Sequence, residues 1–328
     1  MLSCGIQLVL MTYPYGKFYL WDPWFIQENG SIHMFHLKAP CLQNPELRDD
    51  SACIGHAITY DFHSWQELED AIFASEGGWD NLSIWTGSTI KHDGRFYLFY
   101  TGRHRSTPLV QHIGLAVSED LITFERVSDK PVLSADGEIY CKKARLDYLQ
   151  NPPAWRDPFV FREKSGKYIM LITARDASRP APYNACIGAA HSSNLIEWEL
   201  LPPLLSPGIF AEMETPQLVE DSGNYYLFFS CKKSNVNPIS PFAGTGTYMF
   251  SSKQLFGDYT PWNDKSGYID LGDSSVYNFK IIQKAGKQSY ALGWRAYDKN
   301  GNFAGALSKP YEVSFLENRI KITPAITA

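Results

Sequence analysis

Short apolar segments that alternate with polar turns recur along the chain, and the fullest form of this pattern is repeated five times. Each copy has a polar or acidic opening, a short apolar stretch, a glycine-containing turn and then an aromatic-rich stretch. Glycine supplies the positive φ that tight hairpins demand, so each copy predicts a β-hairpin. The five copies are WDPWFIQENGSIHMFHL, WTGSTIKHDGRFYLFYTG, WRDPFVFREKSGKYIMLITA, METPQLVEDSGNYYLFFSC and VYNFKIIQKAGKQSYALGWRA, with turns at Gly30, Gly94, Gly166, Gly223 and Gly286.

A second pair of strand signals follows most of these hairpins, in HAITYDFHSWQEL, IGLAVSEDLITFERV, IGAAHSSNLIEWELL and TYMFSSKQLFGDY. Four strands per repeat is the number found in a propeller blade. The sequence therefore predicts an all-β fold: a single five-bladed β-propeller over residues 1–328, with four-stranded antiparallel blades and a central axial pocket. Residues 313–328 are expected to close the ring with an N-terminal strand at residues 6–11. The blades open near Asp22, Trp85, Asp157, Glu214 and Tyr277.

Composition agrees with a β-rich globular chain and excludes several classes of partner. Of the 328 residues, 44% are hydrophobic and 14% are aromatic, which suits pleated surfaces. The formal net charge is -5 without a basic stripe, so neither nucleic acid nor a membrane surface is expected as a partner. No apolar run reaches the roughly 20 residues of a membrane span, and the apolar start lacks a basic region, so a cytoplasmic protein is expected. Nothing in the pattern specifies an oligomeric state.

Three of the five blade openings carry a carboxylate, at Asp22, Asp157 and Glu214. The first strand of each propeller blade runs near the central axis, so these acids should meet at one end of the channel. Each acid could be a simple turn former, but independent turn formers have no reason to recur at the same position of several repeats. In the other repeats, Ser88 and Asn278 fill the comparable openings. A carboxylate and a carboxylic acid that flank a scissile bond are what glycoside hydrolysis requires.

Metal chemistry is not indicated. Calcium prefers loops rich in Asp and Asn, and no such loop stands out in the sequence. The six cysteines are scattered without CxxC spacing, which predicts neither a zinc site nor a disulfide framework.

Tryptophans gather at the blade openings. A rigid aromatic face can stack on the C–H groups of a sugar and exclude water, whereas core packing is the alternative reading for each tryptophan. The tryptophans are Trp21, Trp24, Trp85 and Trp155.

These motifs resemble those of the five-bladed propeller glycosidases that act on fructosides, glycoside hydrolase families 68 and 32. WDPWFIQ is similar to the W-D-x-W-x-L-Q opening of family 68, and WTGSTIKHDGRFYLFYTG resembles the W-S-G-S…L-F-Y-T segment of both families. WRDPFVF carries the RDP triplet, and EMETPQL resembles the E-I-E-R stretch of family 68 or the E-C-P stretch of family 32. The resemblance covers residues 20–300 and so implies the same propeller fold.

The resemblance implies a role for each acid. Asp22 would be the nucleophile that attacks the anomeric C2 of a fructofuranosyl unit, giving a covalent fructosyl-enzyme with retention. Glu214 would protonate the leaving oxygen and later activate water or an acceptor sugar. Asp157 would bind ring hydroxyls and stabilise the transition state. The substrate-binding residues would be Trp21, Trp24, Trp85, Ser88, Arg156, Glu212 and Tyr277.

The expected function is therefore a retaining glycoside hydrolase or fructosyltransferase on sucrose or a small β-fructofuranoside, with a small carbohydrate as its partner and no metal or organic cofactor. Thr215 stands where family 68 has an arginine after the acid/base glutamate, which favours hydrolysis over polymer synthesis. Two alternatives stay open. One is an inverting arabinofuranosidase or xylosidase like those of family 43, whose carboxylates lie farther apart, and the other is a non-catalytic sugar-binding propeller.

Overall fold

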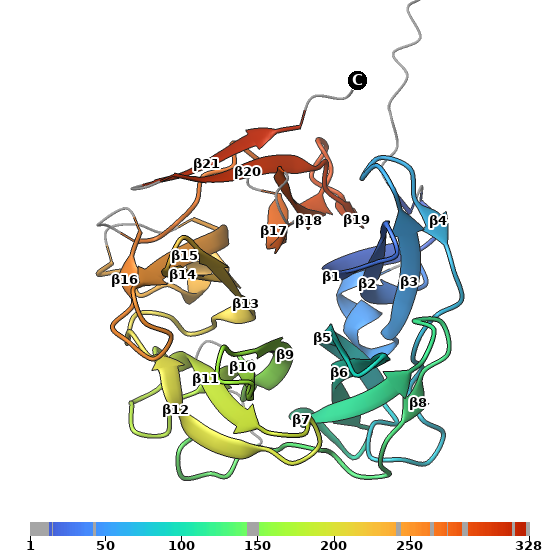
Figure 1. Cartoon of the computed structure of the whole chain (residues 1–328), viewed down its shortest axis with the longest axis horizontal. Helices are drawn as coiled ribbons and strands as arrows, with labels where there is room; N and C mark the ends of the chain where they lie inside the picture. Colours follow the sequence, from blue (N-terminus) through green and yellow to red (C-terminus); the bar gives the residue numbers. More distant parts are fainter. Residues whose placement is uncertain are drawn as a thin grey trace, which may run out of the picture.

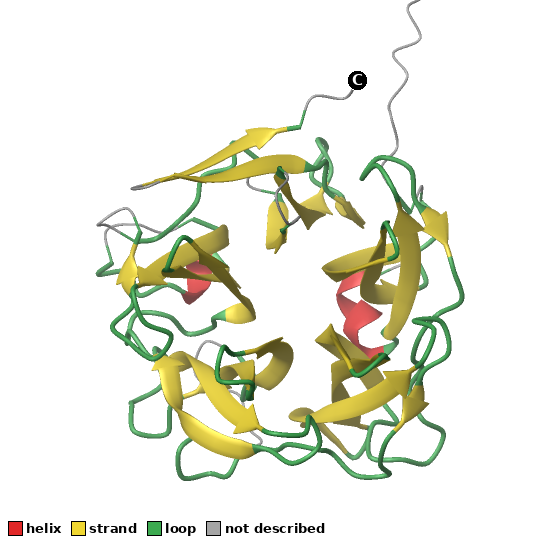
Figure 2. Cartoon of the chain, in the orientation of Figure 1, coloured by secondary structure: helices red, strands yellow, loops and turns green. Residues whose placement is uncertain are grey.

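Five antiparallel sheets stand in a ring in the computed structural model, which confirms the predicted five-bladed propeller (Figure 1). The structure describes residues 13–14, 16–41, 44–142, 151–240, 244–262, 266–273, 275–283, 288–316 and 319–325. Among these residues, strands dominate and helix is confined to two short 3₁₀ segments, η1 (Pro45–Asp50) and η2 (Lys233–Asn235) (Figure 2). None of the helical segments in the described part of the chain is long and apolar enough to cross a membrane.

Each blade is laid down in chain order from its inner strand outward, and the first four blades have four strands each. The fifth blade has the order β17-β18-β20-β21, with β19 as an additional strand beside β18. The strands are β1 (Tyr19–Glu28), β2 (Ser31–Ala39), β3 (Cys53–Thr59), β4 (Gln66–Glu67), β5 (Ser83–His92), β6 (Arg95–His104), β7 (Thr107–Ser118), β8 (Glu125–Arg126), β9 (Trp155–Arg162), β10 (Tyr168–Arg175), β11 (Ala185–Ser192), β12 (Glu199–Leu205), β13 (Glu214–Asp221), β14 (Asn224–Cys231), β15 (Gly246–Ser252), β16 (Thr260–Pro261), β17 (Val276–Ile282), β18 (Ser289–Tyr297), β19 (Phe303–Leu307), β20 (Tyr311–Leu316) and β21 (Arg319–Pro324).

The hairpin turns have the backbone that the glycine pattern predicts. In the first two blades the residue before the glycine, Asn29 or Asp93, is also left-handed, with φ of 48° and 47°. Two left-handed residues in a two-residue loop form a type I′ turn, whose twist matches that of the flanking strands. The fifth predicted turn, at Gly286, lies outside the described residues. Positive φ is found at the other four turn glycines, Gly30, Gly94, Gly166 and Gly223.

The expectation that residues 313–328 close the ring is wrong. The segments β20 and β21 are instead the outer strands of the fifth blade. The physical reason is burial, because Tyr311, Val313 and Ile320 complete the apolar layer between the fourth and fifth blades. The strand expected at residues 6–11 lies outside the described residues.

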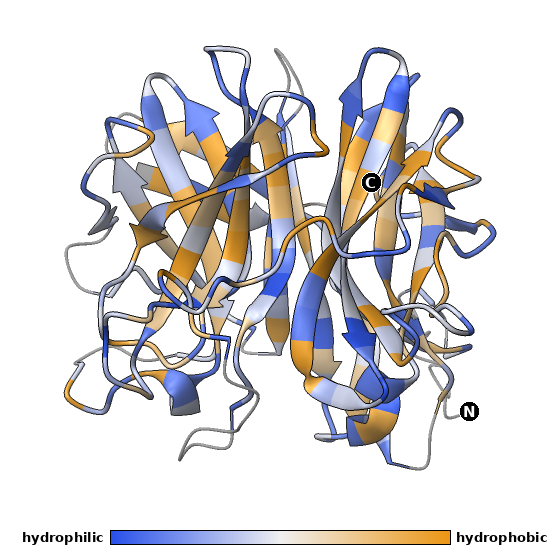
Figure 3. Cartoon of the chain, turned by 90° about the horizontal axis from the view of Figure 1, so that it is seen from below, coloured by the Kyte–Doolittle hydropathy of each residue, from blue (hydrophilic) through white to orange (hydrophobic). Residues whose placement is uncertain are grey.

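Buried apolar side chains of the described residues form layers between neighbouring blades rather than a single central core. Trp24 of the first blade, for example, packs in one layer with Leu98 of the second. The first and fifth blades share a layer in the same way, and there the Leu307 backbone N–H donates to the Tyr13 carbonyl oxygen at 2.9 Å. Figure 3 shows the corresponding apolar bands along the strands and polar residues in the loops at both ends. Each blade therefore depends on both of its neighbours.

The inner strand of every blade is interrupted by a shift in its pairing with the second strand. Such a bulge bends the strand and re-aims a side chain. Four residues at these shifts have a left-handed backbone, which a non-glycine residue adopts only where its surroundings impose it. They are Asp22 (φ 47°), Asp157 (φ 57°), Thr215 (φ 52°) and Asn278 (φ 48°).

Candidate active site

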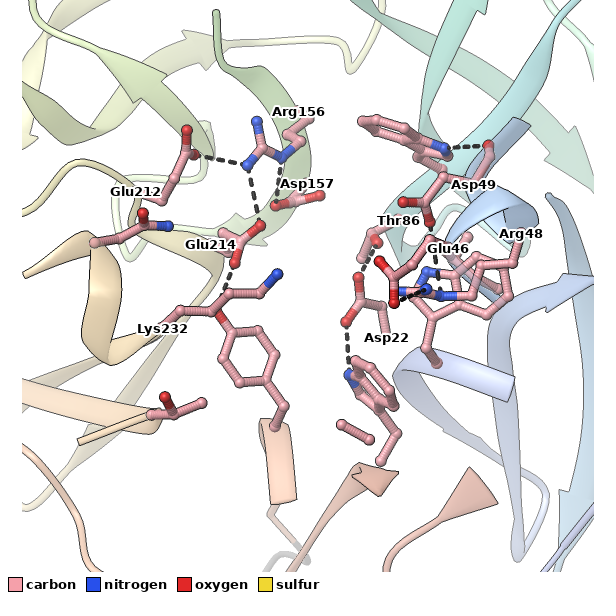
Figure 4. A pocket seen from close by; sticks show the side chains of 18 of the residues that line it. Asp22, Glu46, Arg48, Asp49, Thr86, Arg156, Asp157, Glu212, Glu214 and Lys232 are labelled. Atoms are coloured by element: carbon pink, nitrogen blue, oxygen red, sulfur yellow. Dashed lines mark hydrogen bonds and ion pairs between the residues drawn. The ribbon is translucent and has the colours of Figure 1, made fainter. Parts of the chain in front are cut away.

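A pocket of about 540 Å³ opens where the inner strands of the blades begin, and all five blades contribute to its lining (Figure 4). The three acids of the sequence analysis meet in this pocket, together with most of the expected substrate-binding residues. The expected residues that line it are Trp21, Asp22, Trp85, Arg156, Asp157, Glu212, Glu214 and Tyr277.

The sequence suggested that the three acids occupy one equivalent position of their blades, but in the structure they do not. Asp22 and Asp157 are the left-handed residues of their bulges. In the fourth blade the left-handed residue is Thr215, and Glu214 precedes it by one position. The acids therefore reach the pocket from two adjacent positions of the inner strands, the left-handed residue in the first and third blades and the residue before it in the fourth.

Asp22 is held from two sides. The Thr86 hydroxyl donates to Oδ2 at 3.0 Å, and Trp294 Nε1 donates to Oδ1 at 3.0 Å. Burial and the negative charges of Asp157 and Glu214 raise the pKa of Asp22 to about 7, against the effect of the Thr86 hydrogen bond. Figure 4 shows Asp22 and Glu214 on opposite sides of the pocket. A group bound between them would have one carboxyl group on each side.

Asp157 is anchored through one of its oxygens. Oδ2 accepts hydrogen bonds from Thr173 Oγ1 at 2.9 Å and from the Thr215 backbone N–H at 3.0 Å, and the Asp157 N–H donates to Thr101 Oγ1 at 3.0 Å. Burial raises the pKa of Asp157, although the neighbouring Arg156 guanidinium and the hydrogen bonds to Oδ2 act in the opposite direction. The carboxyl group is therefore fixed in place at the pocket wall.

Glu214 has a more cationic environment than the two aspartates. Arg156 Nη2 donates to Oε1 at 3.1 Å, and the Tyr277 hydroxyl donates to Oε2 at 2.5 Å. Burial acts to raise the pKa of Glu214, but the charges of Arg156 and Lys232 and the Tyr277 hydrogen bond outweigh it and leave the pKa below its usual value. Burial and the Glu214 charge raise the pKa of Tyr277, which keeps its hydroxyl proton available for this bond.

A buried ion-pair network supports the arginine of the RDP triplet. Arg156 Nη2 also donates to Glu212 Oε2 at 2.7 Å, and Arg175 Nη2 donates to Glu212 Oε1 at 2.6 Å. The three side chains are 4–7% exposed, and buried charges need such pairing to offset their lost hydration. Sequence reasoning missed Arg175, whose signal is a charged residue at the end of the otherwise apolar strand YIMLITAR.

Two of the expected substrate-binding residues, Trp24 and Ser88, do not line this pocket. Trp24 is 4% exposed in the layer between the first two blades, and its Nε1 donates to Thr89 Oγ1 at 3.0 Å. The Ser88 hydroxyl accepts the Val160 backbone N–H at 3.0 Å, which ties the second blade to the third. Both residues follow the bulge, where the strand has moved deeper along the axis. The second-blade residue at the depth of the acids is Thr86.

The segment η1 also reaches the pocket, which sequence reasoning did not anticipate. The carbonyl oxygen of Asp49 accepts a hydrogen bond from Trp85 Nε1 at 2.8 Å. The Arg48 guanidinium lies 5.3 Å from the Trp21 ring centroid, and that of Arg103 lies 4.2 Å from the Trp85 ring centroid. These contacts fix the two aromatic walls, and the charged cluster PELRDD was the available signal. Further polar lining residues that were missed are Glu46, Asn151, Lys232, Ser234, Asn235 and Thr245.

No group of three or more His, Cys, Asp or Glu side chains in the described part of the chain is arranged to hold a metal ion. The cysteines at 41, 53, 186 and 231 are free thiols, and Cys4 lies outside the described residues.

Comparisons with known proteins lead to one group of enzymes. Residues 18–324 match the family of glycosyl hydrolases family 32 N-terminal domains. A levansucrase from Erwinia amylovora is 29% identical, over 79% of this chain and 72% of the relative. A sucrose-6-phosphate hydrolase from Bacillus subtilis is 30% identical over 61% of this chain, which spans only 39% of that relative. The structure of an inulosucrase from Halalkalicoccus jeotgali bound to kestose has a TM-score of 0.78 at 25% identity, over 94% of this chain and 87% of that one.

Proposed function

The chain belongs to the glycosyl hydrolases family 32 N-terminal domain family and is a glycosidase, and from this premise we propose that it cleaves sucrose or a small β-fructofuranoside. Cleavage proceeds with retention through a covalent fructosyl-enzyme, and water is the favoured acceptor. The observation that carries the proposal is the placement of Asp22 and Glu214 on opposite sides of one pocket, with Asp157 beside them. The levansucrase, sucrose-6-phosphate hydrolase and inulosucrase relatives support the choice of substrate class.

Asp22 is the nucleophile in this proposal. Its carboxylate attacks the anomeric C2 of the fructofuranosyl unit while the bond from C2 to the glycosidic oxygen breaks, and the leaving oxygen takes the proton of Glu214. In the second step Glu214 removes a proton from water as the water oxygen bonds to C2 and the Asp22 carboxylate leaves. The hydrogen bonds from Thr86 and Trp294 hold the attacking group in one orientation throughout.

Asp157 stabilises the positive charge that develops on the sugar ring. Its carboxyl group is anchored through Oδ2, so it needs no rearrangement as the charge develops. The ring hydroxyls bind to Asp157, and Arg156 with its partner Glu212 completes the polar wall on the same side. Trp21 and Trp85 provide aromatic faces for the fructosyl unit.

The proton needed for leaving-group departure is shared within the pocket. Asp22 has a raised pKa and Glu214 a lowered one, so the last proton of the pair favours Asp22 in the free enzyme, whereas the reaction needs it on Glu214. The two arrangements carry the same total charge, so their ratio does not depend on pH. The expected profile of kcat/KM against pH is therefore a bell, whose width is the range over which the pair holds one proton.

The position after Glu214 supports hydrolysis over chain growth. Thr215 is 4% exposed, and its backbone serves Asp157 rather than a sugar. The arginine that family 68 has at the position of Thr215 would extend its guanidinium group toward the leaving group or acceptor. A buried threonine offers no such contact, so water competes more easily with a second sugar.

The test is incubation of the purified protein with sucrose, with free glucose and free fructose quantified separately. Equal release is expected, and an excess of glucose would mean transfer to another sugar. Release of neither sugar, from sucrose or other fructosides, would overturn the proposal. Proton NMR of the first-formed fructose should show the β-anomer, because an inverting site would release the α-anomer.

Two variants separate the roles of the two carboxyl groups. Asp22→Asn should lower kcat by at least about 10⁴-fold for every substrate, because no nucleophile is left. Glu214→Gln should retain the first step, release of the leaving group in a single turnover, for a fructosyl donor whose leaving group needs no proton, although the second step still lacks its base. Equal losses in this first step on both kinds of donor would contradict the assignment of Glu214 as the acid.

A further inference from the structure

A lysine is buried on the axis of the propeller, beyond the acids. Lys280 lies on β17 after its bulge and is 5% exposed. Its Nζ donates to the carbonyl oxygen of Thr215 at 2.6 Å and to that of Pro216 at 3.1 Å. Burying an ammonium group is expensive, so such a residue persists where its charge and its donors are both used.

Lys280 is half of a reciprocal connection between the fourth and fifth blades. From the fourth blade, Gln217 Nε2 donates to the Ile281 carbonyl oxygen at 2.8 Å, and Gln217 Oε1 accepts the Ile281 N–H at 2.7 Å. From the fifth blade, Lys280 reaches back to the bulge of the fourth. The two inner strands are thus tied together by side chains on both of them.

The bulge to which Lys280 donates, at Thr215 and Pro216, also connects two of the three acids. Glu214 immediately precedes this bulge, and the Thr215 N–H donates to Asp157 Oδ2 at 3.0 Å. On the other side, Tyr277 of the same strand as Lys280 donates to Glu214. Strand β17 therefore contacts the Glu214 side chain through Tyr277, and through Lys280 it holds the backbone of the two residues that follow Glu214.

The charge of Lys280 is felt in the pocket as well. Burial lowers the pKa of Lys280 to about 8, and attraction by Asp157 and Asp22 acts in the opposite direction. The same attraction favours the ionised form of both aspartates. Charges of Asp157, Glu214 and Asp49 also act on Asp22, and those of Arg156 and Glu214 act on Asp157. Lys280 is thus a cation on the inner side of a largely anionic cluster.

We propose that Lys280 is a positioning residue of the reaction, whose ammonium group holds the Thr215–Pro216 bulge and so sets Glu214 relative to Asp157. The expected changes in kcat and in its pH profile rest on the proposed function. The expected change in the position of the bulge rests on the geometry alone. Lys280 does not touch the substrate, so its loss acts on kcat rather than on KM.

The first experiment compares Lys280→Met with Gln217→Met as a matched control. Both variants remove polar connections between the same two strands, but only K280M removes the cation and the grip on the bulge. K280M is expected to lower kcat about 100-fold with KM changed little, as a displacement of about 1 Å at a reacting group does. Without the cation the carboxyl pKa values rise, so the bell of kcat/KM should move to higher pH in K280M and stay in place in Q217M. An unmoved bell, or an equal move in both variants, overturns the proposal.

Lys280→Arg covers the case in which K280M does not fold. The arginine keeps the charge and the donors, so the bell of kcat/KM should stay at the wild-type pH even if kcat falls. A bell displaced to higher pH in K280R would refute the role.

A crystal structure of K280M, or of K280R if only that variant folds, separates this inference from the proposed function. In K280M the Thr215–Pro216 bulge should be displaced and the Thr215 N–H bond to Asp157 lost, and in K280R both should be retained. A K280M bulge that is unchanged, or a K280R bulge that is displaced, refutes the positioning role whatever the enzyme cleaves. A wild-type protein that cleaves no fructoside refutes the proposed function, while these structures still decide the placement.

Discussion

At the scale of single residues, the site combines strain and charge in the same positions. Asp22 and Asp157 are non-glycine residues with a left-handed backbone, and both carry carboxyl groups whose pKa is raised by burial. Both features cost stability and persist only where the surrounding structure imposes them. Hydrogen bonds from Thr86 and Trp294 to Asp22, and from Thr173 to Asp157, fix the two carboxyl groups and offset part of the cost of their burial.

The cost of the Asp22 charge should be visible as a pH-dependent stability. Its pKa is near 3.8 when unfolded and about 7 when folded, so the unfolded state loses its proton first. The stability of the wild type is therefore greatest below pH 4 with respect to this group and falls as pH rises to about 7. Asp22→Asn abolishes this dependence, and its melting temperature relative to wild type should increase from pH 5 to about pH 7 and level off above that pH.

Asp61→Asn is the matched control for this measurement. Hydrogen bonds from the backbone N–H groups of Ser64 and His63 lower the pKa of Asp61 to about 2, so this carboxylate stays ionised in both states above pH 5. The difference between D61N and wild type should be constant over the same pH range. A constant difference for D22N as well would mean that Asp22 ionises normally in the folded protein.

At the scale of elements, hydroxyl groups on the second strands of the second, third and fourth blades hold the inner strand of the blade that follows. The Thr101 hydroxyl accepts the Asp157 N–H, and the Thr173 hydroxyl accepts the Thr215 N–H at 3.1 Å. The Ser230 hydroxyl accepts the N–H of Asn278, which is again a bulge residue, at 3.1 Å. Each hydroxyl stands on a second strand and fixes the bulge of the following inner strand. The acids are therefore placed by their neighbouring blades as much as by their own.

Thr173→Val tests the role of one of these hydroxyl groups. The substitution keeps the shape but removes the donor to Asp157 Oδ2 and the acceptor for the Thr215 N–H. We expect a loss of about 1–3 kcal/mol in the free energy of unfolding, because two buried polar groups lose a partner, and a fall in kcat. The control is Thr247→Val, at a buried threonine hydroxyl that has no hydrogen-bond partner among the described residues. T247V should change neither quantity, and equal effects of the two variants on kcat would refute that role.

Local signals explain how much of these elements could be predicted. The hairpins were predictable because pairs such as Asn29–Gly30 determine their own turn. The bulges were not, since one inserted residue reverses which side chains face the axis and leaves little mark in the sequence. Trp24 and Ser88 were placed in the pocket because of that unseen shift. The outer strands of the fifth blade were misplaced because β19 separates them from their hairpin.

At the scale of the whole molecule, the apolar layers between blades make the ring interdependent. Phe210 lies in the layer between the third and fourth blades, where it packs edge-on against Phe229 with 5.2 Å between the ring centroids. Tyr311 lies in the layer between the fourth and fifth blades, where it packs edge-on against Phe279 with 5.4 Å between the ring centroids. The two layers share the fourth blade, so a loss in one layer weakens the support of the next. We propose on this ground that residues 1–328 form one catalytic domain that unfolds as a unit.

This proposal predicts a single calorimetric transition that two distant cavities shift together. Phe210→Ala should lower the free energy of unfolding by about 3–5 kcal/mol, as large aromatic truncations in packed layers do, and Tyr311→Ala should act in the same direction. One damaged layer borders the third blade and the other borders the fifth, and an interdependent ring still moves the whole transition to lower temperature in both variants, with calorimetric and van't Hoff enthalpies equal. Separate blades would instead give two transitions, with each variant moving only one, and catalytic activity would then be lost in the transition that contains β13 and β17. The sucrose assay carried out during heating identifies that transition directly.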